Sequence, residues 1–217
     1  QVDYAQGRIF GCLRENDLFK NTWVIFTADH GEMLGDHHMS QKNLFFEGSA
    51  HVPLLIMPPQ GRSLPQNISV EAPTDLVDIY PTILAMAGLS SPVSVSGKNL
   101  LEPVPMDRMF FGNSLNKNFC VMEEKLKLVY SAVGDHVLLF DLNTDPMEQH
   151  NLAEDPAWQE RKAKLWKLLL EHTAQYTPEA LDENGQFLTY EAPHFPGDVP
   201  GRWFGFHYHD YSVDTFH

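Results

Sequence analysis

The sequence predicts an α/β core followed by a small α+β subdomain in which one helix packs on an antiparallel sheet. Two observations predict the core: short apolar runs at 22–28 and 52–57 have the character of buried strands, and helical patterns lie on either side of them. A third observation predicts the subdomain, because several short strand-like runs are followed by one long helical pattern. The chain has 217 residues, of which 43% are hydrophobic, so it is long enough to bury such a core.

A helix is expected over residues 1–16. Its apolar side chains Val2, Ile9 and Leu13 recur at helical spacing and would form one face. The pattern is already present at residue 1, with no capping residue before it. We therefore expect the chain to be the later part of a larger protein; a natural, uncapped start is the alternative.

Two strands and a polar loop follow this helix. The run at 22–28 is rich in β-branched and aromatic residues and is soon followed by a glycine, as is typical of a buried strand. A polar loop spans 29–50, and the apolar run at 52–57 predicts a second strand. Residues 68–70 are a candidate third strand.

The next element is a helix expected over 76–87. Gly88 is a natural terminator for it. Pro81 falls inside the helical pattern, so we expect a kink or a break near Tyr80. Residues 90–106 are rich in Ser, Pro and Gly, which is typical of a connector.

The character of the sequence changes after this connector. Short strand-like runs are punctuated by Asn, Gly and Asp residues, which favours an antiparallel meander. These runs lie at 109–111, 119–122, 126–130 and 136–140. A helix over 156–175 carries a stripe of Trp and Leu that would cover the sheet.

The predicted domain organisation has three parts. Residues 1–105 form the end of an α/β core and carry the candidate site. Residues 106–176 form the small α+β subdomain. Residues 177–217 form a tail rich in aromatic, His and Pro residues.

Composition excludes some classes of partner. The net charge of −14 argues against nucleic acid and against anionic membrane surfaces, which both need basic proteins. An anionic small substrate remains compatible, because a bound cation reverses the local field. No apolar run is long enough to span a bilayer. We expect Cys12 and Cys120 to be small buried apolar residues, and a disulfide between them stays open.

The loop at 29–50 concentrates the residues that carry chemistry. Asp29 and His30 follow directly on the first strand, and ligands in open α/β sheets bind beyond the carboxyl ends of strands. Aspartate is a hard oxygen ligand, histidine is a common metal ligand, and Lys42 offers a compact charge for an oxyanion. The pattern predicts a metal-bound anion site, with Asp29 as a cap and His30 as an ordinary loop residue as the alternative.

The order of motifs resembles that of the sulfatase family, within the alkaline-phosphatase-like superfamily. ADHG after a strand is followed by GDHH, by Lys42 five residues before Glu47, and by His-Val-Pro leading into the second strand. Further matches are TDLVDIYPTILAMAGL at 74–89, EEKLKLVY at 123–130 and LFDLNTDPMEQHNLA at 139–153. The resemblance covers residues 1 to about 175. It implies the later part of an alkaline-phosphatase-like mixed sheet with flanking helices, followed by the α+β subdomain.

The resemblance also implies roles for individual residues. Asp29 and His30 look like two ligands of the active-site Ca²⁺. Lys42 looks like the lysine that contacts the sulfate oxygens. His51 stands where many members have Arg and is a candidate substrate-binding residue, with a packing or hydrogen-bonding role as the alternative. His38 or His37, in a GDHH stretch similar to that of phosphonate monoester hydrolases, is a candidate for substrate contact.

One part of the family's pattern is absent from the sequence. Sulfatases carry a C/S-x-P/A-x-R signature whose first residue becomes the formylglycine nucleophile, and neither Cys12 nor Cys120 lies in such a signature. The nucleophile is therefore expected in a missing N-terminal part of the same enzyme. The chain alone is expected to bind Ca²⁺ poorly and to be inactive.

These observations lead to one favoured interpretation and two alternatives. The favoured one is the C-terminal portion of a calcium-dependent sulfatase acting on a sulfated small molecule or carbohydrate. A phosphonate or phosphate diester hydrolase of the same superfamily is the first alternative, and a non-catalytic anion-binding or structural module is the second. An oligomer stays open, and the resemblance favours a periplasmic or secreted location.

Overall fold

The computed structural model describes residues 1–39, 42, 45–62 and 68–191. The chain divides into two compact units that interleave along the sequence. The first comprises residues 1–29, 52–71 and 76–102, and the second comprises 30–51, 72–75 and 103–217. The three-part division predicted from the sequence, with boundaries near 105 and 176, stays a prediction.

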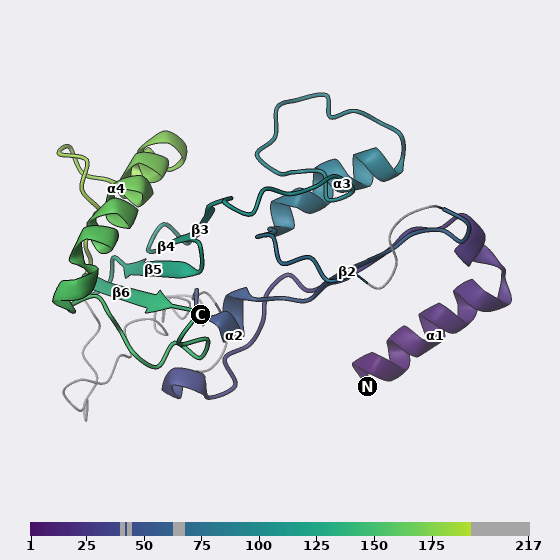
Figure 1. Cartoon of the computed structure of the whole chain (residues 1–217), viewed down its shortest axis with the longest axis horizontal. Helices are drawn as coiled ribbons and strands as arrows, with labels where there is room; N and C mark the ends of the chain where they lie inside the picture. The colour runs from purple at the N-terminus through teal and green to yellow at the C-terminus, as the bar shows by residue number, and fades with distance from the viewer. Residues whose placement is uncertain (40–41, 43–44, 63–67, 192–217) are drawn as a thin grey trace, which may run out of the picture. The chain divides into compact units, whose positions relative to one another are not determined.

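The first unit contains two helices and a two-stranded ribbon (Figure 1). Helix α1 spans Val2–Glu15 and is followed by a 3₁₀ turn η1 at Leu18–Lys20. Strands β1 (Val24–Thr27) and β2 (Leu54–Met57) pair antiparallel, with Thr27 opposite Leu54. The loop between the strands therefore leaves and returns at the same end of the ribbon. The predicted helix and both predicted strands are confirmed.

Three expectations about this unit are wrong for the described residues. Residues 68–70 form no strand. The run of β1 is half-buried rather than buried, because a two-stranded ribbon leaves much of each strand's surface uncovered. Helix α1 buries none of its residues, so Val2 and Ile9 are exposed and so is Cys12.

The third α-helix of the chain begins with the irregularity and ends at the glycine that the sequence predicts. A 3₁₀ turn η3 at Leu76–Asp78 gives way to α3 at Ile79–Met86, so the expected irregularity falls just before Tyr80. Pro81 lies in the first turn of α3, where its missing N–H has no intrahelical acceptor to lose. Gly88 has a φ of +70° and ends the helix, and the next amide donates to the Leu84 carbonyl at 2.8 Å, as in a Schellman cap.

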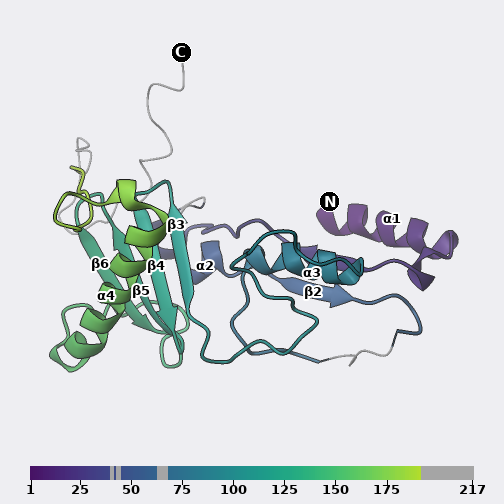
Figure 2. The same ribbon diagram turned by 90° about the horizontal axis from the view of Figure 1, so that it is seen from above.

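The second unit contains the antiparallel meander predicted from the sequence. Its sheet has the order β3-β4-β5-β6. The strands span Phe110–Ser114, Asn118–Glu123, Leu126–Ser131 and His136–Asp141. A 3₁₀ turn η4 (Pro156–Trp158), capped by the Asp155 side chain, leads into helix α4 at Gln159–Tyr176. Helix α4 lies against the sheet, as Figure 2 shows, and the predicted α+β arrangement is confirmed.

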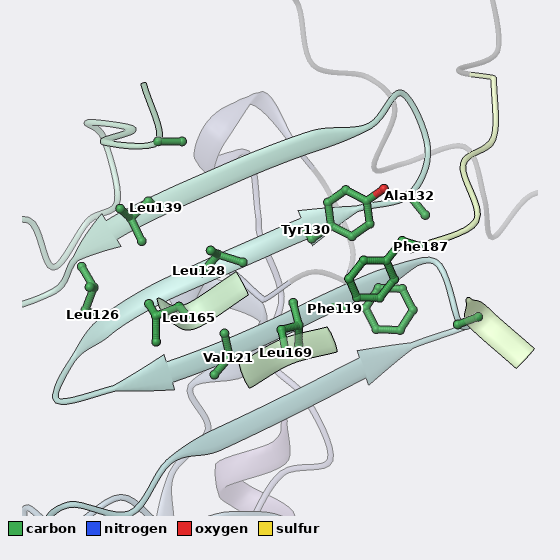
Figure 3. Packing of buried hydrophobic residues seen from close by; sticks show 12 residues of the cluster. Phe119, Val121, Leu126, Leu128, Tyr130, Ala132, Leu139, Leu165, Leu169 and Phe187 are labelled. Carbon is green, nitrogen blue, oxygen red and sulfur yellow. The ribbon is translucent and has the colours of Figure 1, made fainter. Parts of the chain in front are cut away.

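Both faces of this sheet are covered. On one face, Leu165 and Leu169 of α4 pack on Val121 and Leu128, together with an aromatic group around Tyr130 (Figure 3). Side chains alternate along a strand, so the neighbouring residues of β4 and β5 point to the opposite face. There Cys120 and Val129 meet side chains from the loop that follows β1: Met33, Met39 and Phe46. All six residues of β5 are therefore buried.

The last described segment returns to the sheet. After a 3₁₀ turn η5 at Pro178–Ala180, Leu181 bridges to Phe187, whose ring packs in the α4-side core. The remainder of the predicted tail, 192–217, lies outside the described residues. None of the helices in the described part of the chain combines the length and the apolar character that a membrane span requires.

Candidate functional site

The candidate site lies on the loop from His30 to His51, which we call the site loop. Its base is closed by a backbone hydrogen bond of 2.7 Å from the Gly31 N–H to the Ser49 carbonyl. The two segments approach so closely that a Cβ on Gly31 would lie 2.1 Å from the carbonyl oxygen of Gly48. Only glycine fits there, and this close approach holds the neighbouring His30 next to the short helix α2 (Glu47–Ala50).

His30 and Lys42 are brought together within the site loop. The Lys42 Nζ atom lies 3.1 Å from His30 Nε2, and His30 Nδ1 lies 2.7 Å from the Gly31 carbonyl oxygen. An ammonium group only donates and a carbonyl oxygen only accepts, so both contacts are hydrogen bonds when His30 is neutral and carries its proton on Nδ1. The Nε2 lone pair then points away from the backbone, as it must in a metal-ligating histidine.

The other candidate ligand lies in the other unit. Asp29 directly precedes His30 in the chain, ends the first of the three segments of the first unit, and is exposed. A carboxylate suits a hard cation such as Ca²⁺, which takes about six to eight oxygen-rich ligands. Among the described residues, no group of three or more His, Cys, Asp or Glu side chains is arranged to hold a metal. A carboxylate oxygen and an imidazole nitrogen are both donor types found at metal sites, and the role of Asp29 and His30 as calcium ligands stays a prediction.

The two histidines of the GDHH stretch lie in the 3₁₀ turn η2 at Asp36–His38. His37 has a φ of +52° and its ring stacks on Phe46, with centroids 4.2 Å apart and an angle of 19° between the planes. Phe46 belongs to the core on the loop-facing side of the sheet, so His37 packs against that core. The backbone of His38 belongs to the same turn, and its side chain lies outside the described part of the structure.

His51 lies at the other end of α2. Its imidazole is 76% exposed, and its Nδ1 atom lies 2.8 Å from Glu47 Oε2. Glu47 in turn accepts a hydrogen bond of 2.6 Å from Lys127 Nζ, so its carboxylate bridges a histidine and a lysine. His51 is thus accessible to solute but tied to α2.

Sequence reasoning missed the residues that lie under the site loop. Lys127 of β5 and Glu148, which follows β6, are both buried and paired with each other. A signal was present, because Lys127 is the one charged residue in the otherwise apolar run of EEKLKLVY after the turn, and its neighbours on both sides are leucines. Glu148 stands in a turn-rich stretch whose pattern gave no reason to expect burial.

Comparison with known protein families and curated sequences points in one direction. The family model described as "Sulfatase" matches residues 1–89. Arylsulfatase K of Xenopus laevis is 33% identical over 173 residues, covering 70% of this chain and 32% of the relative. The uncharacterised sulfatase YidJ of Escherichia coli (strain K12) is 31% identical over 183 residues, covering 79% of this chain and 36% of the relative. The chain thus spans about a third of the length of these relatives.

Solved structures give the same result for the fold. The phosphonate monoester hydrolase of Agrobacterium radiobacter matches with a TM-score of 0.64 and 32% identity, over 85% of this chain and 42% of its own. BT4656, solved with its substrate D-glucosamine-2-N,6-O-disulfate, matches with a TM-score of 0.64 and 23% identity, over 82% of this chain and 39% of its own. These likenesses confirm the predicted α/β, alkaline-phosphatase-like fold class.

Proposed function

Because this chain belongs to the sulfatase family, we propose that it forms one wall of the active site of a sulfuric ester hydrolase. The observation that carries this proposal is the 3.1 Å contact between Lys42 Nζ and His30 Nε2. An ammonium group and an imidazole lone pair meet there, each as the other's hydrogen-bond partner. The ammonium group suits a sulfate oxygen and the lone pair suits a metal ion, and a bound metal ion would replace the Lys42 hydrogen bond at Nε2.

The geometry supports a proposed role for each residue of the wall. Lys42 would bind an oxygen of the sulfate group and offset the charge that develops on it. The Nδ1–H bond to the Gly31 carbonyl holds the His30 ring in one tautomer and one orientation. His51, exposed beside α2, is a second substrate-binding candidate, whereas the stacked ring of His37 favours a packing role. His38 remains a candidate for substrate contact.

We propose Ca²⁺ as the cofactor, with Asp29 and His30 among its ligands. When bound, the cation would supply positive charge that stabilises the transferring sulfate group. His30 is not available as the acid that protonates the leaving alcohol while its Nε2 binds metal, so that acid comes from another residue. The formylglycine nucleophile also comes from sequence outside this chain, which contains no C/S-x-P/A-x-R signature.

The proposed substrate is a sulfated small molecule or carbohydrate, and the proposed location is the periplasm or the exterior of the cell. The disulfated glucosamine bound by BT4656 is an example of such a substrate in a protein of the same fold. We propose that the remaining groups of the site, including the nucleophile, come from a further part of the same enzyme.

The test compares the full-length protein that carries this chain with its Lys42→Ala variant, using 4-nitrocatechol sulfate as substrate. We expect turnover by the wild type, and a loss of kcat/KM on the order of 100-fold in the variant, as for removal of one group that stabilises a developing charge. Lys167→Ala, on the exposed side of α4, is the matched control and should behave as wild type. The 217-residue chain alone should show no turnover. An inactive full-length protein, or a fully active Lys42→Ala variant, would contradict the proposal.

A phosphonate monoester hydrolase is the second candidate. Two observations favour it: the GDHH stretch at 35–38, and the 32% identity to the Agrobacterium radiobacter phosphonate monoester hydrolase. The same full-length protein assayed with an aryl sulfate and with an aryl phosphonate monoester separates the two. A higher kcat/KM for the sulfate supports the sulfatase, and a higher value for the phosphonate supports the alternative.

A further inference from the structure

A buried ion pair lies beneath the site loop. The side chains of Lys127 and Glu148 are only 3% and 2% exposed, and Lys127 Nζ lies 2.6 Å from Glu148 Oε1. Lys127 Nζ also donates a hydrogen bond to Glu47 Oε1, at 2.6 Å.

The environment of this pair is electrostatically demanding. Burial lowers the pKa of Lys127, but the carboxylates of Glu148 and Glu47 outweigh it and raise the pKa above its usual value. Burial raises the pKa of Glu148 more than Lys127 lowers it. Apolar side chains of similar volume often replace such pairs without loss of stability. Stability alone therefore does not account for a charged pair at this place.

The pair is connected to the site loop through α2. Glu148 Oε2 accepts a hydrogen bond of 2.6 Å from the backbone N–H of Glu47, the first residue of α2. Two residues further along α2, the carbonyl of buried Ser49 accepts the Gly31 N–H that closes the base of the loop. Contacts thus run without a break from the sheet to the residue next to His30.

A second branch leads to His51. The Glu47 carboxylate that receives Lys127 on Oε1 pairs with His51 Nδ1 on Oε2. The first residue of α2 therefore contacts the buried pair directly, and His51 at the other end contacts it through the Glu47 carboxylate. Through Ser49 and through Glu47, α2 is thus connected to the candidate metal ligand His30 and to the candidate substrate-binding residue His51.

We propose that Lys127 and Glu148 are positioning residues that hold α2, and through it His30 and His51, in the conformation that binds a metal-bound oxyanion. Neither residue touches the substrate. The loop conformation is tested directly by the experiment below, and the kinetic consequence rests on the proposed function.

The test replaces the pair by apolar side chains in the double variant Lys127→Met with Glu148→Met. Two methionines fill similar volume without charge, so the melting temperature should stay close to that of the wild type. The Glu47 N–H loses its acceptor, so amide hydrogen exchange at Gly31 and at 47–51 should become about ten-fold faster or more. Imidazole ¹⁵N NMR should show His30 on one tautomer in the wild type and on both in the variant.

Two further variants make the result specific. Lys127→Met with Glu148→Gln returns an uncharged acceptor to the Glu47 N–H and should restore much of the protection. Lys164→Met with Glu123→Met removes an exposed pair between α4 and β4 and should leave the site loop unchanged. Equal exchange rates at 47–51 in the wild type and the apolar double variant would overturn the proposal.

The kinetic arm uses the full-length protein. We expect the apolar double variant to lose about ten-fold or more in kcat/KM at an unchanged melting temperature, which a purely structural role would not produce. If the wild type hydrolyses neither sulfates nor phosphonates, the proposed function fails while the exchange data still decide the positioning role. If the double variant does not fold, the wild type decides: slow exchange at Glu47, comparable to that in β5, supports the proposal, and fast exchange there overturns it.

Discussion

Lys127 and Glu47 lie 80 positions apart in the sequence, yet Lys127 Nζ donates a hydrogen bond of 2.6 Å to Glu47 Oε1. Lys127 belongs to β5, one of the two inner strands of the sheet, and Glu47 begins α2 near the end of the site loop. The site loop also packs Met33, Met39 and Phe46 on the same face of the sheet. The conformation of the site loop therefore depends on its contacts with the antiparallel sheet.

The close approach at Gly31 leads to the first prediction. In Gly31→Ala the added Cβ meets the Gly48 carbonyl at 2.1 Å, and backbone cannot give way as a flexible side chain can. We expect the free energy of unfolding of the second unit to fall by about 1–3 kcal/mol, as at other overpacked sites. We also expect the Gly31–Ser49 hydrogen bond to break. Denaturant unfolding and amide exchange at Gly31 measure both effects.

Gly7→Ala is the matched control for that prediction. Gly7 lies in α1, where a Cβ would meet nothing within 4 Å. Alanine is the better helix former, so this substitution should be neutral or slightly stabilising. A Gly31→Ala variant as stable and as protected as the wild type would show that the loop base is not as tight as the structure has it.

The elements that could be predicted from sequence are those that local rules determine. Alternating apolar residues and turn residues such as Asn116 and Gly134 marked the meander, and Gly88 marked a helix end. The ADHG motif identified His30, and the lysine five residues before Glu47 identified Lys42; the two side chains do lie together although 12 positions separate them. The order of the motifs along the sequence was therefore enough to predict this part of the candidate site.

The parts that could not be predicted depend on long-range packing. Nothing in GDHH indicates that the ring of His37 stacks on Phe46. Nothing near Glu148 indicates that its carboxylate holds the backbone of Glu47, which lies 101 positions away. The exposure of Cys12 was also not predicted. An apolar helical face shows which residues a helix could bury, but α1 buries none of its residues in the described structure.

The core between α4 and the sheet leads to the second prediction. Leu169 is 1% exposed and lies in the cluster with Leu165, Val121 and Leu128 (Figure 3). Leu169→Ala should lower the free energy of unfolding by about 2–5 kcal/mol, because it removes apolar contact and leaves a cavity. Lys167→Ala, exposed on the same helix, should change it by less than about 0.5 kcal/mol. Similar losses in the two variants would contradict the packing described.

The two thiols lead to the third prediction. Cys12 is exposed and Cys120 is fully buried, and both are free. Burial raises the pKa of the Cys120 thiol to about 12, so it has neither access nor thiolate at neutral pH. A chromogenic disulfide reagent should therefore modify one thiol per native chain and both in denaturant. In Cys12→Ser the native chain should not react at all, and a fast reaction there would contradict the burial of Cys120.

The same thiol leads to a prediction about alkaline pH. The pKa of Cys120 rises from 9.0 in the unfolded chain to about 12 in the fold, chiefly through burial. Above pH 9 the unfolded thiol ionises while the folded one keeps its proton, so stability falls as pH rises towards 12. The slope from this group is at most about 1.4 kcal/mol per pH unit. Cys120→Ala should show a shallower decline between pH 9 and 11 in denaturant unfolding, and an unchanged slope would contradict the assignment.

Calcium provides the last prediction, because the chain carries only part of the proposed ligand set. Asp29 and His30 are two donors where Ca²⁺ takes about six to eight, and sites with complete ligand sets on extracellular modules already bind at about 10⁻⁴–10⁻³ M. The dissociation constant of this chain should therefore lie above the millimolar range. Adding about 1 mM Ca²⁺ should then stabilise it by less than about 0.4 kcal/mol, too little to move its melting temperature by more than about 2 °C. The full-length protein, with its remaining ligands, should show a saturable rise that Asp29→Asn abolishes. A large, saturable rise in the 217-residue chain would show that the described residues hold a more complete metal site than Asp29 and His30 provide.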